Sequence, residues 1–585
     1  MPIRLTANRI VFAAALLAGL PRAAFGVAAV TVGTVQIDPP TRNCLGFVVP
    51  ITQGDDNYNA RVGVQYRVAG QSTWKDALPL LRIRPETMST ETPPSDYGLP
   101  DPAESFAGSI IDLQPGTTYE VRFTVTDPDG GGTTQTVTTA TLADPVAAPA
   151  TPRAVAVTTQ AQLDAALAAA QAGDVIQLAA GTYTGITATR SGTLANPIIV
   201  RGAAESTVLL NAAGRSYGID IRANYVYVEQ LTVDGSQWGA RIQNSTGAVI
   251  RHVTFHHLQF GIDGMSANVS AYVCDNTLEG PHQWPDVSSA TWDTEGIAIT
   301  GQGHTVCHNR LSGFGDALGL HQASTPNVAI DFIENDVLWT GDDGMELDYG
   351  YRNIRAYRNR ITNSNMGVSF QPVWGGPVYV IRNVFVNQAA APYKLNNEPS
   401  GFVILNNTSI RTAGYGNYGA QAWTQIGYQL SDHWSVASNF QFKNNIAVGV
   451  TAPLRFTTAP VLAEFDYDGW YPDGQFVIYD TYANLADVKA RSAYEAHGLV
   501  LNGLPFATDP GMPASYTTLV SPKDLSLNAT TSALDSAVVL PNVNDDFAGS
   551  GPDLGALERG RPAPAYGPRT GGATTPNPPT QLRVQ

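Results

Sequence analysis

Alternating apolar and polar residues in the region from about residue 29 to 144 predict a series of short β-strands. Two examples are RVGVQYRVAG (61–70) and YEVRFTVTD (119–127), and turn-forming residues separate such runs. This pattern is typical of an antiparallel β-sandwich, which we place at 29–144. The Ala- and Pro-rich segment 145–153 predicts an extended linker.

From residue 154 to 560 the pattern changes to a repeat. The segment 158–183, TTQAQLDAALAAAQAGDVIQLAAGTY, predicts an amphipathic helix, a glycine stop and a strand. After it, asparagine recurs at intervals of 33, 26, 24, 24 and 24, and a strand-opening glycine at intervals of 21, 22, 35, 23, 25 and 23. The shared period of about 24 predicts stacked coils of short strands. The positions are Asn276, Asn309, Asn335, Asn359, Asn383 and Asn407, and Gly218, Gly239, Gly261, Gly296, Gly319, Gly344 and Gly367.

The repeated asparagines predict a structural ladder, because stacked amide side chains satisfy one another and the nearby backbone. We extend this register upstream to His252 and Gln230 and downstream to Asn445. The neighbouring column of mixed charge predicts a solvated face. It contains Asp275, His308, Glu334, Arg358 and Arg382.

Aligning the coils on the strand glycine predicts which side chains point outward, because side chains alternate across a strand. Neighbouring strands lie ~4.8 Å apart, so one outward column forms a continuous surface. It reads Asp220, Arg241, Asp263, Ala298, His321, Glu346, Ser369 and Lys394, and the next outward column reads Thr300, Ala323, Asp348, Gln371 and Asn396.

An acidic cluster marks this surface. Asp342, Asp343, Glu346 and Asp348 occur within seven residues, and Asp316 lies one coil earlier. Asp293 and Glu295 stand at the turn before that. Like charges this close need a proton, a cation or an arginine among them, and carboxylate oxygens suit Ca²⁺. We expect calcium at Asp342, Asp343 and Glu346, with Asp316 and Asp348 as further ligands. Ordinary turn chemistry is the alternative explanation for Asp343-Gly344.

The composition limits the class of partner and the compartment. A net charge of −16 with no basic stripe argues against a nucleic-acid partner. Residues 1–26 predict a secretory signal peptide, and no later run reaches the ~20 apolar residues of a membrane span. Three cysteines leave at least one unpaired. We therefore expect an exported or periplasmic protein, and a monomer.

Several segments resemble known families. LQPGTTYEVRFTV (113–125) resembles the tyrosine corner of fibronectin type III domains. The cap segment and the coils resemble the pectate-lyase-like right-handed parallel β-helices, and SALDSAVVLPNVNDDFAGSGPDLGALERG (532–560) resembles the closing segment of secreted bacterial members. The fold class implied is mainly β, a right-handed parallel β-helix preceded by a small antiparallel β-sandwich. The Pro- and Gly-rich tail 561–585 predicts disorder.

Asp342-Asp343-Gly-Met-Glu346 resembles the calcium-binding DDxxD element of family 9 pectate lyases, with glutamate in the last position. That resemblance implies β-elimination on an acidic polysaccharide, with a lysine as base and Ca²⁺ as cofactor. Lysine occurs at only five positions, and Lys394 is the one in the outward column. Arg382 and His321 are alternative bases. The catalytic candidates are Lys394, His321, Arg382 and Glu346, and the substrate-binding candidates are Arg241, Gln371, Trp284, Trp292 and Trp374.

Two tryptophans of that set, Trp284 and Trp292, belong to the segment TLEGPHQWPDVSSATWD (277–293), which interrupts both repeats. Such a loop commonly forms a wall of the binding face of a solenoid.

Other functions stay open at this point. An inverting glycoside hydrolase of the polygalacturonase type uses three aspartates, and Asp316 followed by Asp342-Asp343 imitates that layout. However, the NTD, GHG and RIK motifs of that family are absent, as is the DPHE motif of uronan C5-epimerases. The cap also resembles that of family 6 alginate and chondroitin lyases. A non-catalytic glycan-binding or adhesion module with a structural calcium ion is the third alternative.

Overall fold

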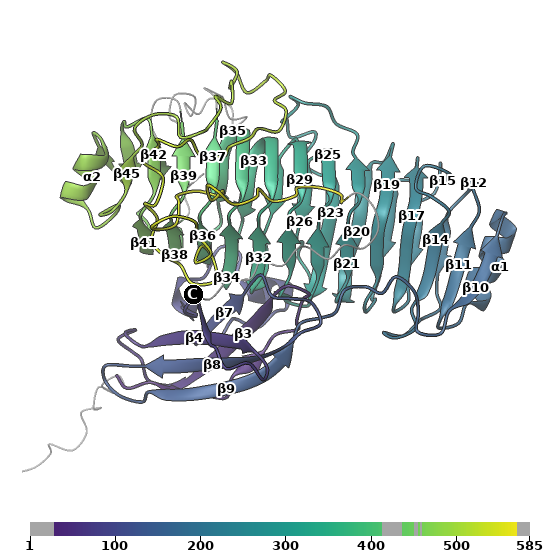
Figure 1. Ribbon diagram of the computed structural model, residues 1–585, viewed down its shortest axis with the longest axis horizontal. Helices are drawn as coiled ribbons and strands as arrows, with labels where there is room; N and C mark the ends of the chain where they lie inside the picture. The colour runs from purple at the N-terminus through teal and green to yellow at the C-terminus, as the bar shows by residue number, and fades with distance from the viewer. Residues whose placement is uncertain (1–27, 412–435, 450–453, 457–458, 570–585) are drawn as a thin grey trace, which may run out of the picture.

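The computed structural model describes residues 28–411, 436–449, 454–456 and 459–569, and for 454–456 the backbone alone. The predicted signal peptide and residues 570–585 of the predicted tail lie outside the described residues. Within them, the chain forms a right-handed parallel β-helix with a small antiparallel β-sandwich packed along its side (Figure 1). The predicted fold class is confirmed.

The N-terminal β-sandwich has two antiparallel sheets that enclose one core. Phe47 and Phe123 meet there with ring centroids 5.0 Å apart. The buried Tyr119 hydroxyl accepts a hydrogen bond from the Gln114 N–H at 2.9 Å. This is the contact expected of a tyrosine corner, while membership of the fibronectin type III family stays a prediction. One sheet contains β1 (Thr31–Val32), β2 (Gln36–Ile37), β3 (Leu45–Gln53), β6 (Leu81–Ile83) and β7 (Ser105–Ile110), and the other β4 (Arg61–Val68), β5 (Lys75–Ala77), β8 (Thr118–Thr126) and β9 (Thr133–Ala140).

The β-helix has three faces of parallel strands, each strand pairing with those one coil before and after it. The first face contains β10 (Arg153–Val157), β11 (Asp174–Leu178), β14 (Ile198–Gly202), β17 (Val226–Asp234), β19 (Val249–His256), β21 (Tyr272–Cys274), β24 (Thr305–Cys307), β28 (Asp331–Ile333), β32 (Ile354–Tyr357), β34 (Trp374–Ile381), β36 (Ser400–Leu405), β38 (Ser438–Lys443) and β41 (Val461–Asp466). The second face contains β12 (Gly181–Tyr183), β15 (Val208–Asn211), the ends of β17 and β19, β22 (Thr277–Glu279), β25 (Arg310–Phe314), β29 (Asp336–Thr340), β33 (Arg360–Phe370), β35 (Val384–Leu395), β37 (Thr408–Ile410), β39 (Ile446–Val448), β42 (Gly469–Tyr471) and β45 (Leu499–Val500).

The third face, called the site face below, carries the outward columns. It contains β13 (Ile186–Ala188), β16 (Tyr217–Ile221), β18 (Trp238–Ile242), β20 (Phe260–Val269), β23 (Glu295–Gln302), β26 (Asp316–Gly319), β30 (Asp343–Glu346) and the ends of β33 and β35. Smaller elements are β27 (Asn327–Val328), β31 (Gly350–Arg352), β40 (Leu454–Phe456), β43 (Phe476–Ile478), β44 (Asp480–Tyr482) and the 3-10 turns η1 (Pro85–Thr87) and η2 (Pro94–Tyr97).

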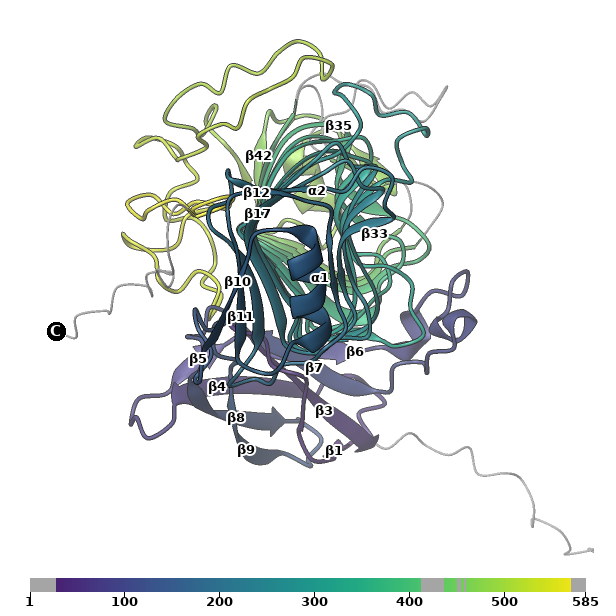
Figure 2. The ribbon, with the colours of Figure 1, turned by 90° about the vertical axis from the view of Figure 1, so that its right-hand side faces the viewer.

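Inward side chains of all three faces fill one continuous apolar core, because residues on either side of each outward position point inside. Met345 and Leu347, which flank Glu346, are fully buried in it. Each fully buried side chain of this size contributes about 1.5–3 kcal/mol. The helix α1 (Gln160–Ala169) closes one end of the stack with Leu163 and Leu167, and α2 (Leu485–Arg491) lies at the other (Figures 1 and 2).

The asparagine ladder is present in the turn between the first and second faces. In each step the Oδ1 of one asparagine accepts from the backbone N–H and the Nδ2 of the asparagine one coil earlier, as Asn383 does for Asn359 at 2.8 and 3.0 Å. The ladder continues through Asn445 to Asp468. The upstream extension was wrong by one residue. Val253, not His252, donates its N–H to the Asn276 Oδ1, and Leu231, not Gln230, pairs with Val253.

The mixed-charge column is covered, so the prediction of a solvated face was wrong. Asp275 and His308 are each 4% exposed. The segment that follows β45 runs back along the coils, and its Arg569 forms an ion pair with Asp275 at 2.5 Å. The Gly567 N–H donates to the Glu334 carbonyl at 2.9 Å. These contacts also overturn the predicted disorder for residues 561–569.

Covalent and polar contacts tie the parts together. Cys274 and Cys307, which are partners in adjacent coils, form a disulfide, and Cys44 is a buried free thiol. Asp38 of the β-sandwich accepts from Arg352 of the β-helix at 2.7 Å. The linker lies on the coils, where the carbonyls of residues 145–147 accept from arginine side chains. In the described part of the chain, no helix has the length and apolar character needed to cross a membrane.

Candidate active site

The strand register fixes the outward column of the site face. Cα partners run from Asp263 through Ala298 and Gly319 to Glu346, and then through Ser369 to Lys394. The placement of His321 in this column was wrong, because Gly319 occupies that rung. Glu295 pairs with Asp316, so Ala317 and not Gly319 is the partner of Gly296. Aligning this coil on Gly319 therefore displaced its residues by two positions. His321 therefore takes the rung that we assigned to Ala323, beside Asp348.

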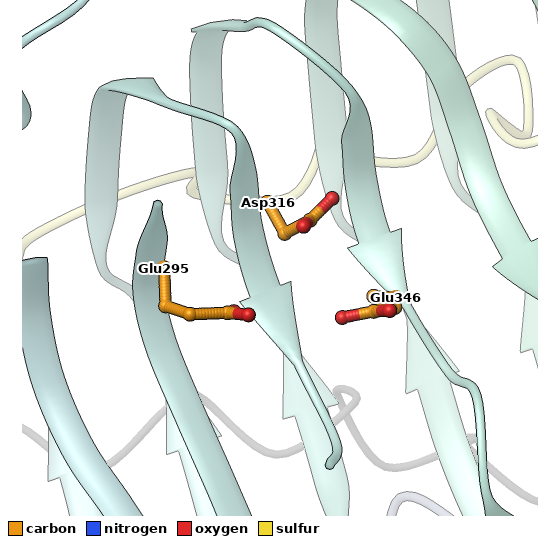
Figure 3. A group of neighbouring side chains, drawn as sticks. All are labelled: Glu295, Asp316 and Glu346. Atoms are coloured by element: carbon orange, nitrogen blue, oxygen red, sulfur yellow. The ribbon is translucent and has the colours of Figure 1, made fainter. Parts of the chain in front are cut away.

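Five carboxylates converge on the site face from three successive coils. Glu295, Asp316 and Glu346 each offer an oxygen, and these oxygens lie within 4.8 Å of one another (Figure 3). Asp316, Asp342 and Asp343 form a second such group with the same spacing. Asp316 belongs to both groups. We call these five residues the acidic centre.

Two hydrogen bonds from within the protein hold carboxylates of the acidic centre, and some of their buried oxygens have no hydrogen-bond partner. The Asp343 N–H donates to Asp316 Oδ1 at 2.9 Å, and Lys394 Nζ donates to Asp343 Oδ2 at 3.1 Å. Asp343 is 1% exposed, yet its Oδ1 has no hydrogen-bond partner among the described residues. The same holds for Glu295 Oε2. Buried polar atoms without partners are rare, so these oxygens mark a place where a ligand is expected.

Burial is the largest cause of an upward pKa shift throughout the acidic centre, and repulsion between the carboxylates adds to it at every member except Asp343, where Lys394 opposes the shift. The pKa of Glu295 rises to about 8 and that of Asp342 to about 7. The pKa values of Asp316 and Glu346 lie well above their usual range for the same reasons. Without a cation, the centre therefore retains protons near neutral pH.

The ligand atoms fit calcium. All ligand atoms of both groups are carboxylate oxygens, which hard divalent cations prefer, and no thiol or imidazole belongs to either group. The buried amide of Asn365 lies beside Asp342, to which it donates at 3.3 Å, and its own Oδ1 has no partner among the described residues. A carbonyl oxygen of this kind is a further ligand type for calcium.

A second row of polar groups borders the acidic centre. Asp348 Oδ1 accepts from Ser369 Oγ at 2.7 Å and from the Gln371 N–H at 2.6 Å. Asn396 Nδ2 donates to Gln371 Oε1 at 3.2 Å. Burial also raises the pKa of Asp348, to about 6. The structure thus brings together seven of the sequence candidates: Asp316, Asp342, Asp343, Glu346, Asp348, Gln371 and Lys394.

The loop 281–294 lies against the acidic centre. The Gly315 N–H donates to the Thr294 carbonyl at 2.8 Å, and a Cβ on Gly315 would stand 2.8 Å from the Trp292 carbonyl. Trp292 is half-buried there. Trp284 is farther along the loop, where its Nε1 donates to the Tyr516 carbonyl at 3.1 Å.

Three candidates lie apart from the acidic centre. Arg382 is held under the C-terminal segment, where it donates to the Val543 carbonyl at 3.2 Å. Trp374 is 1% exposed and contacts the β-sandwich. Arg241 is four rungs upstream of Glu346 and forms an ion pair with Asp220 at 2.9 Å.

Glu295 is the member of the acidic centre that our sequence-based ligand set omits. The spacing of Glu295 could have indicated its place, because it precedes Asp316 by 21 residues, an interval that the glycine repeat also shows. The pairing of Glu295 with Asp316 turns this spacing into proximity.

Comparisons with known proteins give low similarity. No protein-family model matches the chain, and no curated protein does. The PL6 family alginate lyase AlyGC aligns over 68% of this chain and 60% of its own, with 13% identity and a TM-score of 0.35. An alginate lyase from Paenibacillus sp. str. FPU-7 aligns over 55% and 97%, with 16% identity and a TM-score of 0.29.

A family 28 exopolygalacturonase of Yersinia enterocolitica aligns over 76% of this chain and 95% of its own, with 12% identity and a TM-score of 0.27. This chain thus spans 60% of the length of AlyGC. At these values the similarities assign no family to it.

Proposed function

We propose that this protein is an exported, calcium-assisted polysaccharide lyase that cleaves a uronic acid-containing polysaccharide by β-elimination. One observation carries the proposal: a buried acidic centre with unpartnered oxygens lies on the site face, beside the only lysine of the outward column. An acidic centre of this kind attracts a divalent cation, and through the cation an acidic sugar.

Asp316, Asp342 and Asp343 would hold calcium, with Glu346 and Glu295 completing the ligands. When bound, the ion neutralises the carboxylate of the sugar and makes the C5 proton more acidic. Lys394 Nζ, which lies 3.1 Å from Asp343, accepts that proton. Only the neutral amine of Lys394 can accept this proton. The C5–H electron pair then forms the C4=C5 double bond, the C4–O bond breaks with its electron pair going to the leaving oxygen, and that oxygen takes a proton from solvent water.

Residues without large side chains occupy the rungs beside the acidic centre. Ala298 and Gly319 occupy the two rungs before Glu346, and a Cβ on Gly319 would lie 3.4 Å from Glu346 Oε2. The loop with Trp292 forms one wall. The disulfide between adjacent coils suits an oxidising compartment and thus supports export.

The spacing of the carboxylates favours a metal site over an inverting hydrolase. An inverting pair needs carboxyl groups roughly 6.5–9.5 Å apart, so that a water fits between base and sugar. The oxygens of each group here lie within 4.8 Å, close enough to share one ion.

The test is a cleavage assay with purified protein on alginate and polygalacturonate, the polymers named by the matched structures, and on other uronic acid polysaccharides. Calcium-dependent ultraviolet absorbance of an unsaturated product, lost on adding a chelator, supports the proposal. New reducing ends without that absorbance would favour the hydrolase. Glycan binding without either signal would favour a binding module.

A further inference from the structure

The β-sandwich extends to the coils that carry the acidic centre. Its segment around η2 lies beside the coils on the side of β33 (Figure 2). Tyr351 Oη donates to the Pro100 carbonyl at 2.8 Å, and Trp374 Nε1 donates to the Thr92 carbonyl at 2.9 Å. Leu99 is buried among apolar residues of the coils. This segment is therefore a fixed part of the β-helix surface.

Three aromatic rings meet at this contact. Tyr97 of η2 lies 5.2 Å from Tyr349 and 5.5 Å from Trp374, measured between ring centroids, and Tyr349 lies 5.6 Å from Trp374. Trp374 is buried, whereas both tyrosines are partly buried. The buried ring fixes the positions of two tyrosines that keep part of their surface in solvent.

Tyr349 stands next to the acidic centre, in a backbone conformation that a tyrosine rarely adopts. It directly follows Asp348, and its φ is +60°. The same place, three residues after the outward position of the coil, holds asparagine in two other coils: Asn244 with φ +49° and Asn397 with φ +55°. Asparagine tolerates the left-handed region, while a bulky residue there costs roughly 1–2 kcal/mol.

We propose that Tyr97 and Tyr349 form a sugar-binding platform at the edge of the acidic centre, so that the N-terminal β-sandwich completes the substrate-binding site. A tyrosine presents an apolar ring to the C–H groups of a sugar and a hydroxyl to its polar groups. It loses little conformational freedom on binding. The inference rests on the proposed function, since it names a neighbouring subsite for the same polysaccharide.

The test compares full-length variants on alginate and polygalacturonate, following ultraviolet absorbance and reducing ends together. Tyr97→Ala should raise KM about tenfold and leave kcat within about twofold, because the ring acts in binding and not in the reaction. Tyr97→Phe should retain most of the affinity. Calcium affinity, measured by calorimetry, should be unchanged in both variants.

Tyr97→Ala could weaken the contact between the two domains, so a second variant is needed. Tyr349→Asn removes the other ring of the platform, and asparagine suits the local backbone. It should also raise KM. Trp74→Ala is the matched control, since Trp74 is a partly buried aromatic residue of the β-sandwich whose ring centroid lies 4.4 Å from the guanidinium carbons of Arg67 and Arg122.

Wild-type KM in both Tyr97→Ala and Tyr349→Asn would overturn the platform while leaving the lyase intact. A wild-type protein that neither cleaves nor binds these polymers would overturn both. Reducing ends without absorbance would overturn the lyase alone, because the KM comparison still holds.

Discussion

The asparagine ladder and the acidic centre are built in the same way and differ in one chemical respect. The ladder places asparagines at one position of successive coils, and Glu295 and Asp316 of the acidic centre are paired in the same way. The asparagines are buried, and the carboxylates are buried or partly buried. An asparagine carries a donor and an acceptor, so each step of the ladder satisfies the next, as Asn359 and Asn383 do. A carboxylate carries acceptors only, so stacking leaves oxygens such as Asp343 Oδ1 without a partner.

This difference separates stability from binding. A self-complementary stack lowers the free energy of the fold and offers nothing to a ligand. A stack of acceptors raises the free energy of the empty fold and is stabilised by cations or protons. The end of the ladder combines the two arrangements. The Asn445 N–H donates to Asp468 Oδ1, and the Asp468 N–H donates to Glu495 Oε2, so two carboxyl groups lie together there.

The largest expected effect is on activity. Lys394→Ala should lower kcat by about 10²–10⁴-fold, the usual contribution of a general base, without changing the melting temperature of the calcium-bound protein by much. Lys443→Ala is the control, since Lys443 pairs with the exposed Glu464. Rates on the substrate found by the cleavage assay check this, and near-normal turnover in Lys394→Ala would remove Lys394 as the base.

A substitution in the asparagine ladder should lower stability, in contrast to the loss of activity expected of Lys394→Ala. Asn359→Ala removes the acceptor of the Asn335 N–H and Nδ2, at 3.0 and 2.9 Å, and leaves both donors buried. We expect the free energy of unfolding to fall by about 2–4 kcal/mol. Calorimetric unfolding measures this, with Asn502→Ala as an exposed control. An unchanged stability would mean that the ladder is not a stabilising element.

A swap between the two chemistries sharpens the comparison. Asp316→Asn gives the acidic centre an amide while the carbonyl can still accept from the Asp343 N–H. Calcium affinity should fall at least about tenfold, because the ligand common to both groups loses its charge. The calcium-free protein should become more stable, since a buried amide is neutral without having to bind a proton. Calorimetry with and without calcium tests both, and unchanged calcium affinity would place the ion elsewhere.

The smallest effect is a pH dependence at the end of the ladder. Burial raises the pKa of Glu495 from 4.5 to about 8, and burial together with the charge of Glu495 raises that of Asp468. The folded state therefore keeps a proton that the unfolded chain releases. This stability is complete below about pH 4.5 and is lost as the pH rises through about 8.

Glu495→Gln should flatten this decline. The measurement is the melting temperature of both proteins across that pH range, in the same calcium concentration. Parallel curves for variant and wild type would contradict the assignment.

Local pattern was sufficient for the fold and for most of the acidic centre. The asparagine and glycine repeats carry the coil period, and Asp342, Asp343, Glu346 and Lys394 are placed correctly by it. The errors share one cause. A repeat defines the period, but only the backbone pairing decides which residue occupies a given position. Gly319 and not His321 therefore lies in the outward column, and Val253 and not His252 lies in the ladder.

Contacts between distant segments were out of reach of any repeat. The covering of Asp275 by Arg569 spans 294 residues, and the contact of Trp374 with Thr92 spans 282. Nothing in the local pattern of either partner encodes such a pairing, because it depends on where the whole surface of each domain meets the other.

The sequence by itself thus determined the sandwich, the coil period, the asparagine ladder and the presence of an acidic cluster, since each follows from side-chain alternation and repetition along the chain. Only the tertiary structure decided that Glu295 shares a possible ligand group with Asp316 and Glu346, that Arg382 lies apart from the acidic centre, and that Tyr97 packs against Tyr349. The physical reason is that periodicity encodes neighbours within a stack, whereas the meeting of loops, tails and domains is set by the packing of complete surfaces.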